Sequence, residues 1–471
     1  MSRSSKPISF VLGGVAALVI LVVAATTLLL RVNAKSRVEA AASNALEMDV
    51  KVVGRTAIGF FPSVHIALED VHAHKQGADV ASAGEVNLGI EILPLLHREV
   101  RIKNIAVKRL RIALEKGRDG KLNVERSSAV KGALAELSIA KASISDATLT
   151  YVNRLSGNTL EAANCSLDVS RLLRSVKSAA FLNNLLFAAQ LACGRIRTED
   201  FTASDVKLSV DGKNGVFNFA PVTMSLLGGH GSGSVRVDVS GSVPTYHVRY
   251  DLAQLRIEEF FKAFSSKQLG AGSMDFATKL SLRGKTTDAL KRSVEGEASL
   301  HGEDLRLAIG DLDKKFARYE SSQSFNLVDV GAFFFIGPLG VGITKGYDFA
   351  RIFEGSEGST TISTLVSGWQ IEHGVAHATD VAMATPKNRV ALKGGLDFVI
   401  GRYDDVTVAL IDTKGCARVQ QKIHGPFRQP QVEKPNVLRA LAGPTAKLLR
   451  QAKDLFGGSC EVFYAGSVVA P

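Results

Sequence analysis

GFFPSVHIALEDVHAH, residues 59–74, holds three of the ten histidines of the chain and alternates apolar with polar side chains. Val64, Ile66 and Leu68 occupy every second position, and successive side chains of a β-strand point to opposite faces. The stretch therefore predicts a strand with one apolar face. His72 and His74 would share one face of such a strand, and two imidazoles on one face can bind a metal ion.

The metal alternative needs further ligands at a supporting spacing, and no Asp, Glu or Cys stands at such a spacing from the two histidines. A surface strand also carries histidine on its wet face without any metal. The same argument applies to His373 and His377, which could share the face of another strand. We therefore predict a strand at residues 59–74 and no metal site.

The same period of two recurs along the chain, for instance at Val86–Ile92, Ile102 and Leu110–Leu114. Stretches rich in turn formers, such as DGKNG (211–215) and LGGHGSGS (227–234), separate later strands at intervals of about ten residues. This spacing is typical of a meandering antiparallel sheet. The predicted fold is mainly β with few helices, built as an elongated, curved antiparallel sheet with an apolar groove.

A few segments have helical character instead. Residues 171–193 are rich in Leu and Ala without a period of two, and predict a helical crossover. LRIEEFFKAF (255–264) predicts a short helix with one apolar stripe. The residues that follow Pro444, from Thr445 to Phe456, predict a C-terminal amphipathic helix.

Residues 8–30 form an uncharged stretch of 23 residues. As a helix it would span about 35 Å, and the hydrocarbon core of a bilayer is about 30 Å thick. It predicts a membrane anchor that follows a short tail at 1–7. A cleaved signal peptide is the alternative, but no Ala-x-Ala type site stands before Arg31. Basic residues flank both ends of the stretch, so charge does not decide its orientation.

The net charge of +11 is concentrated in two zones. Residues 98–126 carry ten Lys and Arg against four acidic residues, and residues 414–453 carry nine against one. Such zones could meet anionic lipid headgroups, and a solvated basic face is the simpler alternative. Nucleic acid is a weaker candidate partner for a membrane-anchored body, and we predict none.

The four cysteines lack the close spacing of a metal site. In an oxidising compartment the natural local pairs are Cys165 with Cys193 and Cys416 with Cys460, and free buried thiols are the alternative. The usual catalytic motifs are absent from the sequence, including G-x-S-x-G, H-E-x-x-H and the phosphate-binding loop. We predict no catalytic residues, no cofactor and no enzymatic activity.

Several stretches resemble the AsmA family: residues 54–74, 81–114, 120–125, 144–169 and 187–241. The resemblance rests on strand and turn patterning. It implies an N-terminal AsmA-like β region at 31–170 and a C-terminal one at 194–300, followed by further β repeats at 301–471. It also implies a single-pass inner-membrane protein with a periplasmic body, similar to bridge-like lipid-transfer proteins.

On this basis we expect phospholipid binding or transfer that serves outer-membrane assembly and lipid homeostasis. The candidate groove residues are Val64, Ile66, Leu68, Val86, Leu88, Ile90, Ile92, Ile102, Ile112 and Leu114. The candidate headgroup contacts are Arg101, Lys103, Lys108, Arg109 and Arg111. Ordinary core packing and a solvated face are the respective alternatives. The rival function is an envelope scaffold or assembly factor that binds a protein partner and carries no lipid.

Overall fold

The computed structural model describes residues 34–59, 65–75, 77–91, 102–124, 139–174, 185–199, 201–262, 269–308, 310–322, 358–427, 429–433, 436–437 and 460–471. The fold is mainly β, as predicted. The chain divides into two compact units, residues 1–226 with 232–245 and residues 227–231 with 246–471. No helix within the described ranges is long and apolar enough to cross a membrane. The predicted anchor at 8–30 and the predicted helix at 445–456 lie outside those ranges.

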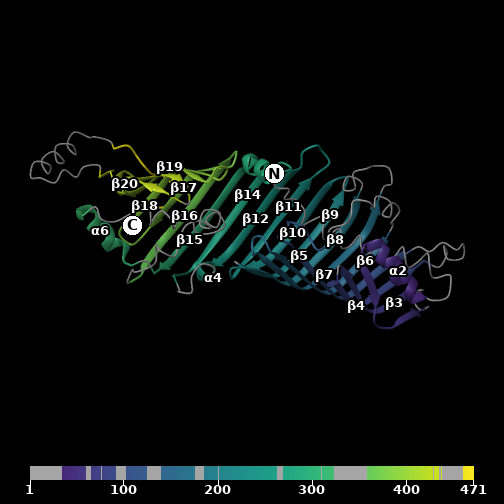
Figure 1. Cartoon of the computed structure of the whole chain (residues 1–471). Coiled ribbons are helices and arrows are strands. Elements are labelled where there is room, and N and C mark those ends of the chain that lie inside the picture. The colour runs from purple at the N-terminus through teal and green to yellow at the C-terminus, as the bar shows by residue number, and fades with distance from the viewer. Residues whose placement is uncertain are drawn as a thin grey trace, which may run out of the picture. The chain divides into compact units, whose positions relative to one another are not determined.

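Among its described residues, the first unit contains the helix α2 (Ala34–Leu46) and a sheet whose first two strands both pair with the third, with the later strands following in chain order (Figure 1). The strands are β1 (Asp49–Val52), β2 (Thr56–Gly59), β3 (His65–Lys75), β4 (Ala78–Ile90), β5 (Ile102–Lys116), β6 (Ile139–Asn153), β7 (Thr159–Arg174), β8 (Leu185–Thr198), β9 (Thr202–Lys213), β10 (Val216–Leu226) and most of β11 (Gly229–Asp238). The expected strand at residues 59–74 is β3, and it begins at His65.

Two expectations for this sheet were wrong. The sheet is mixed, because β5 and β6 pair in parallel while the pairs on either side of them are antiparallel. The long connection between Lys116 and Ile139 permits this, since parallel neighbours need a crossover and cannot be joined by a tight turn. The prediction of a helical crossover at 171–193 is also wrong, because the described residues of this segment belong to β7 and β8. Pairing with β9 and burial of Ala189 and Cys193 outweigh the helix propensity of the Ala- and Leu-rich sequence.

A row of irregular backbone positions crosses the strands of this unit at one level. Asp70 of β3 lies opposite Gly84 of β4, and Gly84 lies opposite Arg109 of β5, as the flanking pairs show. Arg109 lies in turn beside Asp146 of β6. Asp70, Arg109 and Asp146 have φ values of 49°, 53° and 54°. The row continues through Asn164 of β7 and Asp205 of β9, with φ values of 54° and 52°.

The row changes which side chains face the core. On β3 the buried residues are Ile66 and Leu68 before the row, and Val71 and Ala73 after it. The inward positions therefore switch from even to odd numbers, as at a β-bulge. Because β3, β4 and β5 switch at the same level, the register between them is constant across the row.

The second unit is an antiparallel meander with short helices. Its strands are most of β12 (Thr245–Arg256), β13 (Gly270–Ala271), β14 (Ser273–Arg283), β15 (Glu295–Leu307), β16 (Thr360–Glu372), β17 (Val375–Ala384), β18 (Arg389–Asp397), β19 (Arg402–Ile411), β20 (Ala417–Pro426), β21 (Gln431–Val432) and β22 (Asn436–Val437). Its helices are α4 (Ile257–Lys262), α5 (Thr287–Ser293) and α6 (Leu312–Ser322). The expected helix within 255–264 is α4, which buries Ile257, Phe260 and Phe261.

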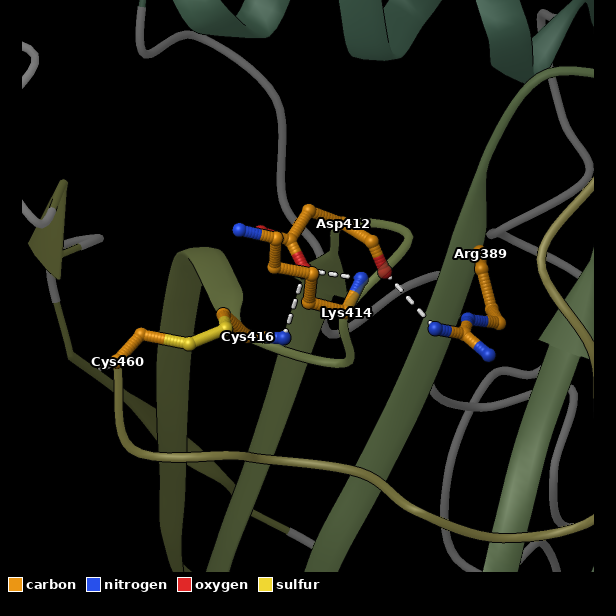
Figure 2. Close-up of a disulfide and its surroundings, with 5 residues drawn as sticks. All are labelled: Arg389, Asp412, Lys414, Cys416 and Cys460. Atoms are coloured by element: carbon orange, nitrogen blue, oxygen red, sulfur yellow. Dashed lines mark hydrogen bonds between the residues drawn. A yellow bond between two sulfur atoms is a disulfide. The ribbon is translucent and has the colours of Figure 1, made fainter. Parts of the chain in front are cut away.

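A disulfide joins Cys416 to Cys460 and holds the C-terminal residues 460–471 against this unit (Figure 2). The Arg389 guanidinium donates to the carbonyl oxygens of Val468 and Asp412, each at 2.8 Å. Val468 and Tyr464 are buried in a cluster with alanines of β17, β18 and β19. The Tyr464 hydroxyl donates to the Asp380 carboxylate. The C-terminal segment is therefore part of the core of this unit.

The first prediction tests the irregular row. Asp146→Val is expected to lower the free energy of unfolding by about 1–3 kcal/mol, because a β-branched residue is strained at positive φ. Asp168→Val, on an exposed position of β7 without positive φ, is the matched control and should have little effect. Asp146→Gly should be tolerated. Urea unfolding measures all three variants, and equal losses in the two valine variants would contradict the role of the row.

The second prediction concerns the Tyr464 hydroxyl. Burial, together with its hydrogen bond to Asp380, raises the pKa of Tyr464 from 10.0 to about 12. A raised pKa in the folded state stabilises the fold below pH 10, and this stabilisation is lost as the pH rises towards 12. Tyr464→Phe should cost about 1–3 kcal/mol at neutral pH. The variant should also lose less stability than wild type between pH 10 and 12. Unfolding temperatures of both proteins, measured as a function of pH, test this. Parallel curves for the two proteins would contradict the assignment.

Candidate functional site

One face of the first unit is apolar, and the described candidate groove residues on β3 and β4 lie on it. Ile66, Leu68, Val86, Leu88 and Ile90 are buried in one hydrophobic cluster. Ile66 pairs with Leu88 and Leu68 with Val86, so the four side chains form two cross-strand pairs on the same face.

The other groove candidates are either less buried than these five residues or lie outside the described part of the chain. Ile112 and Leu114 lie on β5 and are partly buried. Val64 and Ile92 are outside the described residues, and Ile102 begins β5 but its side chain is not described. The sequence analysis missed Ile105 and Val107, which are fully buried in the same cluster. They were missed because Arg109 shifts the inward positions of β5, so the pattern read from Leu110 to Leu114 does not extend backwards. The change of face is visible in the structure as the positive φ of Arg109 within β5.

Helix α2 closes this face and the sheet edge at the β1 end. Ala42 and Leu46 of α2 are buried in the cluster. The backbone N–H of Val50 donates to the Ser43 hydroxyl and that of Val52 to the Glu39 carboxylate, each at 2.8 Å. These bonds satisfy backbone N–H groups on the outer edge of β1, which could otherwise pair with a strand of another chain. The candidates on β3 and β4 belong to the same cluster and are almost fully buried, so they form a closed part of the core.

The apolar face continues beyond this closed part. Val169, Ala189, Val210 and Phe217 extend the cluster over β7 to β10. Leucine, phenylalanine and valine side chains that are only partly buried pack at its border: Leu167, Phe187, Leu208, Phe219, Val237 and Val239. A second cluster continues the same side of β7 and β8 around the Cys165–Cys193 disulfide. Leu110 of β5 and Ile144 of β6 are partly buried as well, but the larger accessible part of the face is on β7 to β11.

Two aromatic rings meet over a glycine in this accessible part. Gly212 of β9 pairs with Phe187 of β8 on one side and Phe217 of β10 on the other. The ring centroids are 5.9 Å apart. A β-carbon at Gly212 would lie 2.4 Å from the Phe187 ring and 2.9 Å from the Phe217 ring. Only glycine lets both rings lie over this strand.

The described headgroup candidates Lys103, Lys108, Arg109 and Arg111 are exposed, and Arg101 is not described. Lys108 and Arg111 alternate with the inward residues Val107, Leu110 and Ile112, so they point to the face opposite the apolar cluster. Lys108 forms an ion pair of 3.3 Å with Glu85. Hydrogen bonds from Asn87 and then Lys108 lower the pKa of the Glu85 carboxyl. Lys108 and Arg111 are thus on the side of the sheet opposite the apolar face.

Two clefts are described in this unit, and one of them reaches the apolar face. One, of about 610 Å³, is lined by residues of α2, β1 and the β3–β4 turn. The other, of about 550 Å³, lies at the ends of β8, β9 and β10, where Phe187 and Gly212 of the apolar face line it together with polar residues such as Arg236. Near the first, Asp79 lies beside His72 and His74. The sequence analysis did not identify this acidic partner.

The third prediction tests the packing at Gly212. Gly212→Ala should lower the free energy of unfolding by about 1–3 kcal/mol, because the new methyl group overpacks the two rings. Gly241→Ala is the control, since a β-carbon there meets only a backbone oxygen at 4.0 Å. Urea unfolding of both variants measures the difference, and equal stability would show that the rings do not depend on this glycine.

A comparison with known families agrees with this architecture. The AsmA family model matches residues 5–180 and 133–307, which together cover more than half of the chain. No curated protein matches the sequence. The chain belongs to the AsmA family.

Proposed function

We propose that this protein binds phospholipid acyl chains on the apolar face of its first unit and takes part in envelope lipid transport that serves outer-membrane assembly. The observation that carries the proposal is the continuous apolar cluster from β3 to β10, with partly buried side chains at its border. Membership of the AsmA family supports a role of this kind. Phospholipids are the proposed partners, and an envelope protein partner would fit the same role.

The physical basis is the cost of moving a lipid through water. An acyl chain of about 16 carbons loses about 12 kcal/mol of favourable burial when fully exposed, at about 0.8 kcal/mol per methylene. An apolar face that covers several methylene groups at once offsets much of this cost. The partly buried residues of β8, β9 and β10 are better placed for this contact than Ile66 and Leu88, which are packed in the closed part.

The proposed location is the inner membrane, with residues 8–30 as a single anchor and the body in the periplasm. The two disulfides support an oxidising compartment. Helix α2 begins three residues after Arg31, and three residues reach at most about 10 Å. The α2 end of the first unit would therefore face the membrane. The role is one of binding, without catalysis.

The test is lipid content after expression. The full chain is produced in a bacterial envelope, purified in mild detergent and washed, and bound phospholipid is quantified by mass spectrometry. We expect at least one phospholipid per chain. Leu208→Asp, which places a carboxylate on the partly buried border of the face, should lower the content by at least about fivefold, since a buried charge without a partner is unfavourable.

Ser209→Asp is the matched control. Ser209 is the next residue of β9, is also partly buried and points to the opposite face. It should retain the wild-type lipid content. Both variants are first compared with wild type by circular dichroism and thermal unfolding. Well-folded wild-type protein without lipid, or equal lipid content in both variants, would contradict the proposal and favour the envelope scaffold instead.

A further inference from the structure

We propose that His72, His74 and Asp79 form a binding site for a divalent transition-metal ion of the zinc type. The three side chains offer one ligand atom each, and these atoms all lie within 4.8 Å of one another. The Asp79 carboxylate is 3.4 Å from Nδ1 of His72 and 3.7 Å from Nε2 of His74. Ligands of a tetrahedral zinc ion with bonds of about 2.0–2.1 Å are separated by about 3.4 Å. The group is close to this geometry before any ion is bound.

The backbone creates this arrangement. His72 and His74 are two residues apart on β3, so both point away from the apolar face that contains Val71 and Ala73. The pairing of β3 with β4 then shifts by one residue, from Ala73 with Ala81 to His74 with Asp79. This shift leaves Val80 unpaired and buried, and it brings Asp79 onto the face of the histidines. Irregularities of this kind often re-aim a side chain towards a functional site.

The chemistry of the three groups suits a borderline metal ion. Imidazole nitrogens and a carboxylate are common zinc ligands, and three protein ligands leave a fourth position for water. The two imidazole rings are nearly parallel, with centroids 5.9 Å apart and an angle of 18° between their planes. The side chains of His72 and His74 are 33% exposed and that of Asp79 is 54% exposed, so an ion can enter from solvent.

The charges near the histidines are of both signs, because Lys75 lines the same cleft and Arg111 lies two strands away on the same face. On β1, Asp49 lies opposite His74 and Lys51 lies opposite His72. The Lys51 ammonium is 3.2 Å from the Asp49 carboxylate, which offsets its positive charge. His74, Asp49 and Lys51 also line the cleft of about 610 Å³ at the end of α2, which gives the site room for water.

A metal ion at this site would stabilise the end of the first unit at which α2 packs. Its ligands come from both strands of the β3–β4 hairpin. On the other side of these strands, Val71 and Ala73 belong to the cluster that contains Ala42 and Leu46 of α2. A bound ion would therefore fix the hairpin on which α2 and β1 pack, and would stabilise this end of the sheet.

The experiment is zinc titration of the full chain in detergent, purified without a polyhistidine tag and stripped with a chelator. Isothermal titration calorimetry is expected to give one Zn²⁺ per chain with a dissociation constant in the micromolar range. Asp79→Asn should weaken binding by at least about tenfold, and His72→Ala with His74→Ala should abolish it. Zn²⁺ should also raise the unfolding temperature of wild type and leave that of the double variant unchanged.

His301→Ala is the matched control. His301 lies 3.3 Å from Glu303, so it is an exposed histidine–carboxylate pair like those of the site, and this variant should bind Zn²⁺ as wild type does. Absence of binding at millimolar Zn²⁺ would overturn the proposal and leave a simple histidine–aspartate contact. Binding that survives in the double variant, or that is lost equally in His301→Ala, would overturn it too. Chelator-treated variants that unfold at the wild-type temperature exclude a folding defect as the cause.

Discussion

The first unit depends on one constraint: every strand of a sheet with a single apolar face must keep its apolar side chains on that face. The row of left-handed positions makes this a collective requirement. Asp70, Arg109 and Asp146 each shift the inward positions of their strands by one residue. Because β3, β4, β5 and β6 shift at the same level, the pairs between them remain in register on both sides of the row, whereas the β6–β7 pairing shifts there. A strand that lacked its irregular position would expose half of its apolar side chains.

Each unit also completes its core with a segment from one end of the chain, by different interactions. In the first, α2 buries Ala42 and Leu46 and satisfies the edge of β1 through Ser43 and Glu39. In the second, residues 460–471 add Tyr464 and Val468 to the core and are held by the Cys416–Cys460 disulfide. On the loop-entropy model, a disulfide that closes a loop of this size contributes about 4 kcal/mol.

The separation of charge and apolar surface shapes the proposed function. Lys108 and Arg111 lie on the face opposite the cluster, and Lys108 is paired with Glu85. An acyl chain on the apolar face would therefore meet aliphatic and aromatic side chains, such as Leu208 and Phe187. The basic side chains remain available to an anionic surface on the other side. The closed part on β3 and β4 contributes stability, and the accessible border on β7 to β11 is where binding is proposed.

The sequence by itself determined the β class, the short helix at Ile257–Lys262 and the family. It offered the two local cysteine pairs as one of two alternatives, and the structure joins both pairs. These follow from local periodicity, turn chemistry and short chain separation. Only the tertiary structure decided that residues 185–193 form a strand, that β5 and β6 are parallel, that Ile105 and Val107 face inward, and that Asp79 lies beside His72 and His74. Each of these depends on pairing with another strand, and a shift of one residue in that pairing reverses the face of every side chain that follows.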